Sequence, residues 1–276
     1  MARNITIKPG SSVKEYWKDL WEHRQLLWIL SKRDISVRYK QTLLGIAWSV
    51  IRPLATMIVM TIAFSVVAKL KPDEGVPYPL MVLGGITIWT FFSNTFVQIS
   101  NSITLNSNLV AKVYFPRLIM PLSAVSVGLV DFLIAFVLYL LISIVGYSYW
   151  PSSNIVYLPF FILLTFMTAF GFGLFFAAVN VRFRDIAQLI PFIVQVGIYA
   201  CPIAYSSQMV AGTWYYKYHL LNPIVSLVDG FRWCLLGNNA YFDIRSLYST
   251  IIISTIALVL SVTYFRKKES SFVDHL

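Results

Sequence analysis

The sequence has little charge and little cysteine for its length. Charged residues make up 12% of the 276 residues, about half the fraction found in soluble domains. The two cysteines, Cys201 and Cys234, are too few for a disulfide framework. One bridge between them stays open as an alternative, but we favour ordinary small apolar roles. The first forty residues are polar and basic, so we expect no cleaved signal peptide.

Motifs of common enzymes are missing as well. No G-x-x-x-x-G-K-[ST] segment occurs, so the chain should not bind ATP through a P-loop. His23, His219 and His275 are far apart, and no His/Cys cluster has the spacing of metal ligands. Asp73 and Glu74 fall in a short loop, where we expect a solvated turn. No carboxylate pair lies in one apolar stretch, as acid–base chemistry requires. We expect no catalytic site, cofactor or metal in this chain.

Long apolar runs are what the sequence does contain. Hydrophobic residues make up 58% of the chain, and the mean hydropathy is +0.70. A bilayer core of about 30 Å needs about 20 apolar helical residues to cross it. We therefore predict an all-α membrane protein with six transmembrane helices. The predicted spans are 45–68, 79–103, 118–146, 156–181, 187–204 and 246–265.

The basic residues predict the orientation of these spans. Sixteen of the 22 Lys and Arg residues fall on one side of the predicted membrane. Positive loops stay in the cytoplasm, so both termini should be cytoplasmic. The basic balance then reflects anionic lipid headgroups and not nucleic acid. We divide the chain into a cytoplasmic segment 1–44, a membrane domain 45–265 and a cytoplasmic tail 266–276.

An amphipathic helix is predicted over residues 13–30. Aromatic and aliphatic residues, including Tyr16, Trp17, Trp21 and Trp28, recur there at steps of three and four. Ser12 and Glu15 have the spacing of a capping box, which marks the helix start. Such a helix either lies at the headgroup boundary or packs against the cytoplasmic ends of the spans.

A basic segment follows this helix directly before the first span. It contains Lys32, Arg33, Arg38, Tyr39 and Lys40. These side chains suit an anionic lipid head or a ligand phosphate. The alternative is that they are only the positive flank that orients a span.

Two charges lie inside predicted spans. Arg52 is about seven residues into the first span, roughly 10 Å along a helix, and Asp131 is near the middle of the third. Intramembrane charges usually face a partner, a cavity or a pathway. The two residues either pair with each other, or Arg52 reaches the interface and Asp131 bonds neighbouring polar groups. We favour the second arrangement.

Aromatic and small residues in the spans indicate how helices pack and what they line. Trp89, Phe92 and Tyr199 belong to a set of rings, most of which should face lipid or neighbouring helices, while a subset are candidates to line a passage where sugars stack. Gly171 and Gly173 should let span four approach its neighbours closely. The run 223–236, with its two charges, is too short to span, and we predict a re-entrant or surface helix on the outer face.

Several segments together resemble the permeases of ABC exporters for O-antigen, capsule and teichoic acid. They are 31–35 (SKRDI), 38–42 (RYKQT), Leu44-Gly45, Trp48, Pro53, 180–186 (NVRFRDI), Leu221-Asn222-Pro223 and Gly230-Phe231-Arg232. The likeness covers nearly the whole chain, in order.

The resemblance implies an architecture and a substrate. It implies a homodimer of six-span subunits in the bacterial inner membrane, bound to two separate ATPase subunits that hold ATP and magnesium. It also implies export of a polysaccharide attached to a polyprenyl diphosphate, for which we favour O-antigen. Residues 13–30 would be the interface helix, and 205–236 an outer gate hairpin.

The resemblance and the side-chain chemistry together assign candidate sites. The substrate candidates are Arg33, Arg38, Tyr39, Lys40, Arg52, Trp89, Phe92 and Tyr199. The candidates for ATPase coupling are Asn108, Lys112, Tyr114, Pro116, Arg117, Arg182, Arg184 and Asp185.

Two other functions compete with this interpretation. A proton-coupled flippase working without an ATPase would use Asp131 as its titrating group. The lack of internal repeats and of a second buried carboxylate argues against it. A membrane transferase acting on polyprenyl lipids would need an acidic constellation at the membrane face, which the sequence does not contain.

Overall fold

The computed structural model describes residues 13–40, 45–183 and 185–272, and it is helical with no strand in these ranges. Eleven α-helices follow one another in this part of the chain. They are α1 (Val13–Glu22), α2 (Arg24–Lys40), α3 (Ala47–Met60), α4 (Tyr78–Leu105), α5 (Ser107–Lys112), α6 (Ile119–Leu141), α7 (Leu158–Arg182), α8 (Ile186–Gly197), α9 (Tyr216–Leu221), α10 (Pro223–Leu236) and α11 (Ile244–Lys268).

Two of the α-helices continue as π-helical segments, and four short 3₁₀ segments lie elsewhere in the described chain. The π-helical continuations are η1 (Thr61–Val67) after α3 and η2 (Ile142–Gly146) after α6. The 3₁₀ segments are η3 (Ser153–Tyr157), η4 (Ser207–Met209), η5 (Gly237–Asn239) and η6 (Glu269–Ser271).

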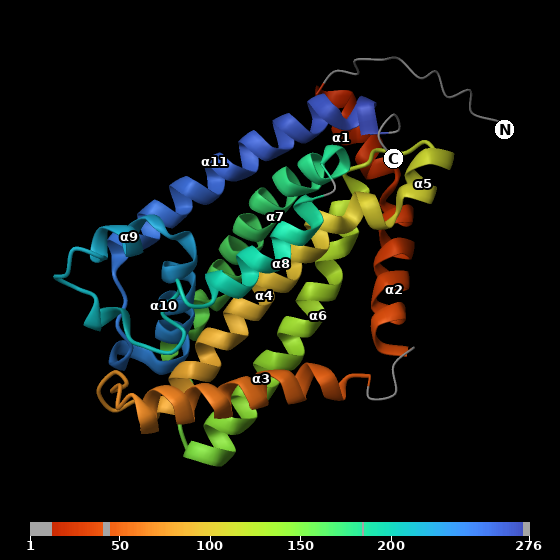
Figure 1. Cartoon of the computed structure of the whole chain (residues 1–276). Coiled ribbons are helices and arrows are strands. Elements are labelled where there is room, and N and C mark those ends of the chain that lie inside the picture. The colour runs from red at the N-terminus through yellow and green to blue at the C-terminus, as the bar shows by residue number, and fades with distance from the viewer. Residues whose placement is uncertain (1–12, 41–44, 184, 273–276) are drawn as a thin grey trace.

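Helix α4 is the centre of the bundle. It packs along both α6 and α7, and α11 packs against the other side of α7 (Figure 1). One hydrophobic cluster joins α4 and α7 to α10, and a second joins their other ends to α1, α2 and α11. We call these the α10 end and the α5 end of the bundle. Helices α1 and α5 are both found at the α5 end of the bundle (Figure 1).

Small residues bring α7 close to its neighbours, as predicted. A Cβ on Gly171 would lie 2.9 Å from the backbone nitrogen of Leu258 on α11. A Cβ on Gly173 would lie 2.9 Å from Ile99 on α4. Helices in a membrane associate by close packing, so these two glycines allow α7 to contact α4 and α11 at short range.

Five helices in the described ranges are long and apolar enough to cross a membrane. They correspond to predicted spans one, two, three, four and six. The predicted fifth span, 187–204, is different because α8 ends at Gly197 and turns follow it. Carbonyls freed in these turns bond side chains instead: Asn222 donates to Ala200 O at 3.2 Å. The six-span count is therefore not confirmed.

The predicted helix over 13–30 is two helices that meet at His23. Tyr16 and Leu30 are buried against the α5 end of the bundle, and the Arg266 guanidinium lies 4.5 Å from the centre of the Tyr16 ring. Trp21 and Trp28 remain 71% and 72% exposed. The predicted apolar face therefore has two parts. Tyr16 and Leu30 pack against the ends of the long helices, whereas Trp21 and Trp28 face outward.

Helix α10 lies inside the bundle. Twelve of its 14 residues are buried, and it packs against α4, α7 and α11. The predicted outer hairpin therefore contains a helix that is covered on most sides. Cys201 and Cys234 are both buried and free, so the alternative of a bridge between them is wrong.

Candidate functional site

Asp131 on α6 gathers donors from three other elements. Arg38 Nη2 on α2 lies 2.5 Å from Asp131 Oδ2, and the Tyr39 hydroxyl donates to Oδ1. Ser49 Oγ on α3 and Asn94 Nδ2 on α4 each lie 3.3 Å from the carboxylate. Burial and the hydrogen bond to Asp131 raise the pKa of the Tyr39 hydroxyl to about 12, so this group keeps its proton and donates.

These residues line a pocket between α2, α3, α4 and α6, which we call the Asp131 pocket. Its volume is about 390 Å³, within the range of small-molecule sites. Apolar side chains, both arginines and the carboxylate contribute to the lining together. The lining includes Val37, Arg38, Tyr39, Trp48, Ser49, Arg52, Pro53, Thr90, Asn94, Asp131 and Ala135.

No ion pair joins Arg52 to Asp131 among the described residues, so the two charges do not form the pair that was one alternative. The Arg52 side chain is exposed at the pocket, and its guanidinium lies 5.7 Å from the centre of the Trp48 ring. What the sequence did not predict is that the main partner of Asp131 is Arg38. That residue is 93 positions away in the chain.

A second pocket lies on another side of α4 and is aromatic. We call it the aromatic groove, and its volume is about 270 Å³. A Cβ on Gly197 of α8 would lie 2.7 Å from the Trp89 ring, so the glycine lets α8 sit against this ring. The rings of the groove are Trp89, Phe92, Phe96, Phe172, Phe176 and Tyr218.

The eight predicted substrate residues do not form one site: some line the Asp131 pocket, some line the aromatic groove, and three line neither. Arg38, Tyr39 and Arg52 line the Asp131 pocket, and Trp89 and Phe92 line the aromatic groove. The remaining three line neither pocket. Arg33 donates to Asn106 Oδ1 at 2.8 Å and pairs with Asp34, Lys40 is exposed at the end of α2, and Tyr199 is 70% exposed.

The segment around α5 presents three of the predicted coupling residues on its surface. Val110 and Phe115 are buried and anchor the segment at the α5 end. Asn108, Lys112 and Tyr114 are exposed. An anchored short helix with an exposed polar face suits contact with another protein.

The other coupling candidates have varied surroundings. Pro116 is buried, and the Arg117 backbone N–H donates to Glu269 Oε1 at 2.7 Å. The Arg117 guanidinium also donates to the Glu269 carbonyl, so this residue ties the α5 segment to the end of α11. Arg182 is exposed beside the Phe183 ring, and Asp185 is exposed before α8. Arg184 lies outside the described residues.

The sequence of this chain matches one family from α2 to α10. A sequence profile described as "ABC-2 type transporter" matches residues 25–236. The chain belongs to the ABC-2 type transporter family.

Curated relatives cover this ABC-2 transporter chain almost end to end. It is 25% identical over 261 residues to the "O-antigen export system permease protein RfbA" of Myxococcus xanthus, covering 94% of this chain and 98% of the relative. It is 27% identical over 255 residues to a protein of the same name from Klebsiella pneumoniae, covering 91% and 95%. The "Polysialic acid transport protein KpsM" of Escherichia coli is 21% identical over 246 residues, covering 87% and 92%.

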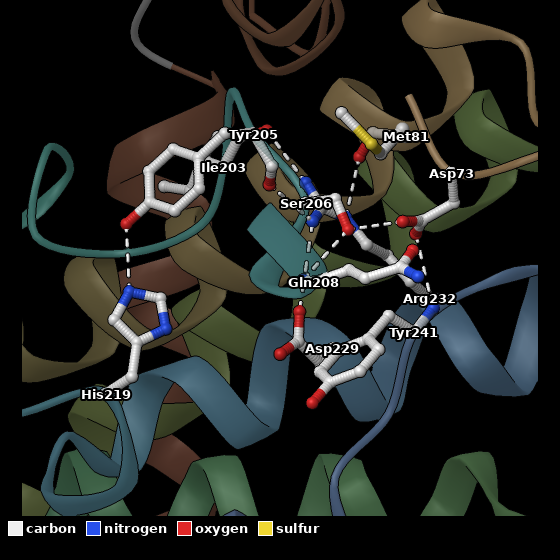
Figure 2. Close-up of polar contacts among 10 residues, drawn as sticks. All are labelled: Asp73, Met81, Ile203, Tyr205, Ser206, Gln208, His219, Asp229, Arg232 and Tyr241. Atoms are coloured by element: carbon white, nitrogen blue, oxygen red, sulfur yellow. Dashed lines mark hydrogen bonds and ion pairs between the residues drawn. The ribbon is translucent and has the colours of Figure 1, made fainter. Parts of the chain in front are cut away.

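A buried arginine in this ABC-2 transporter chain was not among the predicted site residues. Arg232 on α10 is 2% exposed. Its guanidinium donates to Met81 O at 2.9 Å, Ile203 O at 2.7 Å and Tyr205 O at 3.4 Å, while Asp229 lies 3.9 Å away (Figure 2). Arg232 therefore joins α10, α4 and the turns that follow α8.

Asp73 corrects the prediction of a solvated turn. It is buried, and its carboxylate accepts from Ser206 Oγ and from the Tyr241 backbone N–H (Figure 2). The loop that follows η1 is thereby tied to the segments on both sides of α10. The sequence contained no comparable signal for Asp73, whereas the buried contacts of Arg232 were signalled by Asp229 and Arg232 three residues apart in a mainly apolar run.

Metal chemistry finds no support in the side-chain geometry. Within 13–40, 45–183 and 185–272, no group of three His, Cys, Asp or Glu residues is placed to hold a metal ion. The chemical capacity of the two pockets is recognition: guanidinium and hydroxyl donors in one, and stacked rings in the other.

Proposed function

We propose that this chain is the membrane-spanning subunit of an ATP-driven exporter. It moves a polysaccharide attached to a polyprenyl diphosphate from the cytoplasm to the periplasm of a bacterium, and the polysaccharide is O-antigen. One observation carries the proposal: relatives named for O-antigen export or polysialic acid transport align with 87 to 94% of the chain.

The energy source in this proposal is a separate protein. Two ATPase subunits bind ATP and magnesium and contact the α5 segment through Asn108, Lys112 and Tyr114. The exposure of these side chains on an anchored helix supports such a contact. Asp185 and Arg182, exposed where α7 meets α8, form the second contact.

The proposed complex contains two copies of this chain. Helices α3 and α8 carry few buried residues, Pro53 in α3 and Ile190 in α8, although both helices are apolar. Copies would meet through these two helices, whose apolar side chains otherwise face lipid. Both termini are cytoplasmic in this arrangement, which the bias of the basic residues supports.

The two pockets suit the two chemically distinct parts of the substrate. Phosphate oxygens form charge-assisted hydrogen bonds with guanidinium groups, and the Asp131 pocket contains Arg38 and Arg52. Sugar rings pack on aromatic faces, and the aromatic groove contains Trp89 and Phe92. The hairpin that ends in α10 then acts as the outer gate, with α10 entering the membrane from the periplasmic side.

Export in cells tests the proposal. A strain lacking its own O-antigen permease receives this chain together with its ATPase, and surface polysaccharide is measured. We expect export with both subunits and none with either alone. Export by the permease without any ATPase would contradict the proposal.

Coupling is tested separately on the α5 segment. Lys112→Glu and Tyr114→Ala should leave the permease in the membrane but abolish co-purification of the ATPase. Lys217→Glu, an exposed lysine at the other end of the bundle on α9, is the matched control. Unchanged ATPase binding by the two α5 variants would exclude α5 as the contact.

The proton-coupled flippase is not favoured. Its titrating group would be Asp131, whose carboxylate is instead engaged by Arg38 and three further donors. These contacts leave Asp131 in a role of recognition or structure.

A further inference from the structure

The Asp131 carboxylate occupies the position where an anionic ligand would meet its donors. Arg38 and Tyr39 both point to it from the last turn of α2, and Asn94 and Ser49 reach it from two other helices. Four donors converging on two oxygens resemble the surroundings of a bound phosphate. Here the chain supplies the anion from its own α6.

The two partners of the Arg38–Asp131 ion pair differ in how accessible they are to a ligand. The Arg38 side chain is 36% exposed, whereas the Asp131 side chain is 9% exposed. Arg38 therefore faces the pocket volume on one side and the carboxylate on the other. A ligand in the pocket can reach Arg38 without moving α6.

The charges of the pocket leave room for one more anion. Arg38 and Arg52 bring two positive charges and Asp131 one negative charge to the lining. No carboxylate within the described ranges pairs with Arg52, whose guanidinium rests against Trp48. Planar guanidinium groups bind phosphate oxygens in pairs, so two arginines match the two phosphates of a diphosphate.

We propose that Asp131 is a built-in substitute for the diphosphate of the lipid-linked substrate. In the empty pocket it holds Arg38 and Tyr39, and the incoming polyprenyl diphosphate displaces it and takes over both donors. Arg52 binds the second phosphate. This inference rests on the proposed function, and it adds that Asp131 competes with the substrate and so sets its affinity.

The exchange also connects substrate binding to α2. Arg38 and Tyr39 are the side chains by which the last turn of α2 is bonded to α6. When the diphosphate takes these donors, the direct polar link between α2 and α6 is replaced by a link through the substrate. The loaded and empty pockets therefore differ in what holds the end of α2.

Ligand binding by the purified full-length permease in nanodiscs tests the exchange. The probes are undecaprenyl diphosphate, phosphatidylglycerol and uncharged undecaprenol. Asp131→Asn keeps the size of the side chain and removes the charge, and Glu74→Gln, an exposed carboxylate in the 68–77 loop, is the matched control. We expect Asp131→Asn to bind the diphosphate roughly tenfold tighter, as when a coupled competitor is removed. Arg38→Gln should bind it roughly tenfold more weakly, and Glu74→Gln like the wild type.

The other outcomes are equally informative. Asp131→Asn binding the diphosphate no tighter than the wild type overturns the proposal. An equal gain for phosphatidylglycerol assigns the pocket to a membrane lipid and also overturns it. If the wild type exports polysaccharide in cells while the gain is missing, only the exchange fails. If the permease and its ATPase export nothing, the proposed function itself fails.

A measurement on the wild type guards against poor folding of the variant. A hydrophobic carbodiimide labels accessible carboxyl groups, and the Asp131 peptide is quantified by mass spectrometry. Displacement by undecaprenyl diphosphate should increase the labelling of Asp131 at least twofold, and undecaprenol should not. A decrease would mean that the ligand covers an undisplaced Asp131, which contradicts the proposal.

Discussion

Two of the arginine–aspartate pairs in this protein, Arg232–Asp229 and Arg38–Asp131, have opposite surroundings. Arg232 and Asp229 are three residues apart on α10 and both buried, and most of the guanidinium donors go to backbone carbonyls. Arg38 on α2 and Asp131 on α6 are 93 positions apart in the sequence, and the arginine is partly exposed beside a pocket.

The difference separates structure from recognition. A guanidinium that satisfies carbonyls of several elements cannot leave without exposing them to an apolar interior, where each unpaired group is costly. A guanidinium that is partly exposed at a pocket and bonded to a carboxylate can change partners at a smaller cost. We therefore expect Arg232 to determine stability and Arg38 to determine transport.

Arg232→Ala should have the largest effect on stability. It removes the donors of Met81, Ile203 and Tyr205 and leaves Asp229 without its cation. Breaking a buried pair in this way costs about 3–5 kcal/mol, so we expect little folded protein. Thermal unfolding in detergent, followed by gel filtration, measures the loss. If Arg232→Ala were as stable as the wild type, the assignment of Arg232 to stability and Arg38 to transport would be contradicted.

Asp229→Asn should be milder than Arg232→Ala. The guanidinium keeps its three carbonyl acceptors and loses only a carboxylate 3.9 Å away. The expected cost is about 1–3 kcal/mol, as for one altered buried polar group. The same unfolding assay measures it. A loss larger than that of Arg232→Ala would indicate that the carboxylate, and not the carbonyls, is the main partner.

Arg38→Gln should change transport much more than stability. Arg38 is partly exposed, and Asp131 keeps the donors Tyr39, Ser49 and Asn94. Losing the pair should therefore destabilise the protein less than Arg232→Ala does, by about 1–2 kcal/mol. Export should nevertheless fall at least tenfold, because the pocket loses a phosphate ligand. Lys40→Gln, two residues along α2 but outside the pocket lining, is the control and should retain export. Equal export by both variants would contradict the role of the Asp131 pocket.

Arg245→Ala should have the smallest effect and calibrates the series. Its side chain is 77% exposed and lies 4.0 Å from Asp243. Exposed ion pairs contribute little, so neither unfolding nor export should change measurably. A clear loss would show that the assays respond to any lost arginine.

The long helices were predictable because each one depends on a local property of the sequence, the length of its apolar run. Apolar runs of sufficient length identified five of the long helices, and Gly171 and Gly173 correctly indicated close packing of α7. Span five was predicted too long because hydropathy averages over Pro202 and the turns around it. Hydropathy does not register that Arg232 and Asn222 supply the donors for those carbonyls.

The candidate site was predicted in part. Arg38 and Tyr39 were identified from the basic segment before the first span, and Arg52 from its charge inside that span; all three line one pocket. Arg33 and Lys40 are also basic residues of α2, but they lie outside the pocket lining. Helix packing decides which face of α2 meets α6, and the sequence of α2 alone does not show it. Asp73 was predicted to be solvated because its partners, Ser206 and Tyr241, are more than 130 residues away.

The sequence by itself determined a helical membrane protein, its helix-forming runs and its family, since a helix in lipid must satisfy its own backbone within one segment. Only the tertiary structure decided which charges meet. Arg38 pairs with Asp131, and Arg232 donates to carbonyls of α4 and of the turns after α8. These contacts form because helices distant in sequence pack with one particular rotation about their axes and one relative height in the bundle. Those relative positions arise from contacts along their whole lengths, which no short stretch of residues encodes.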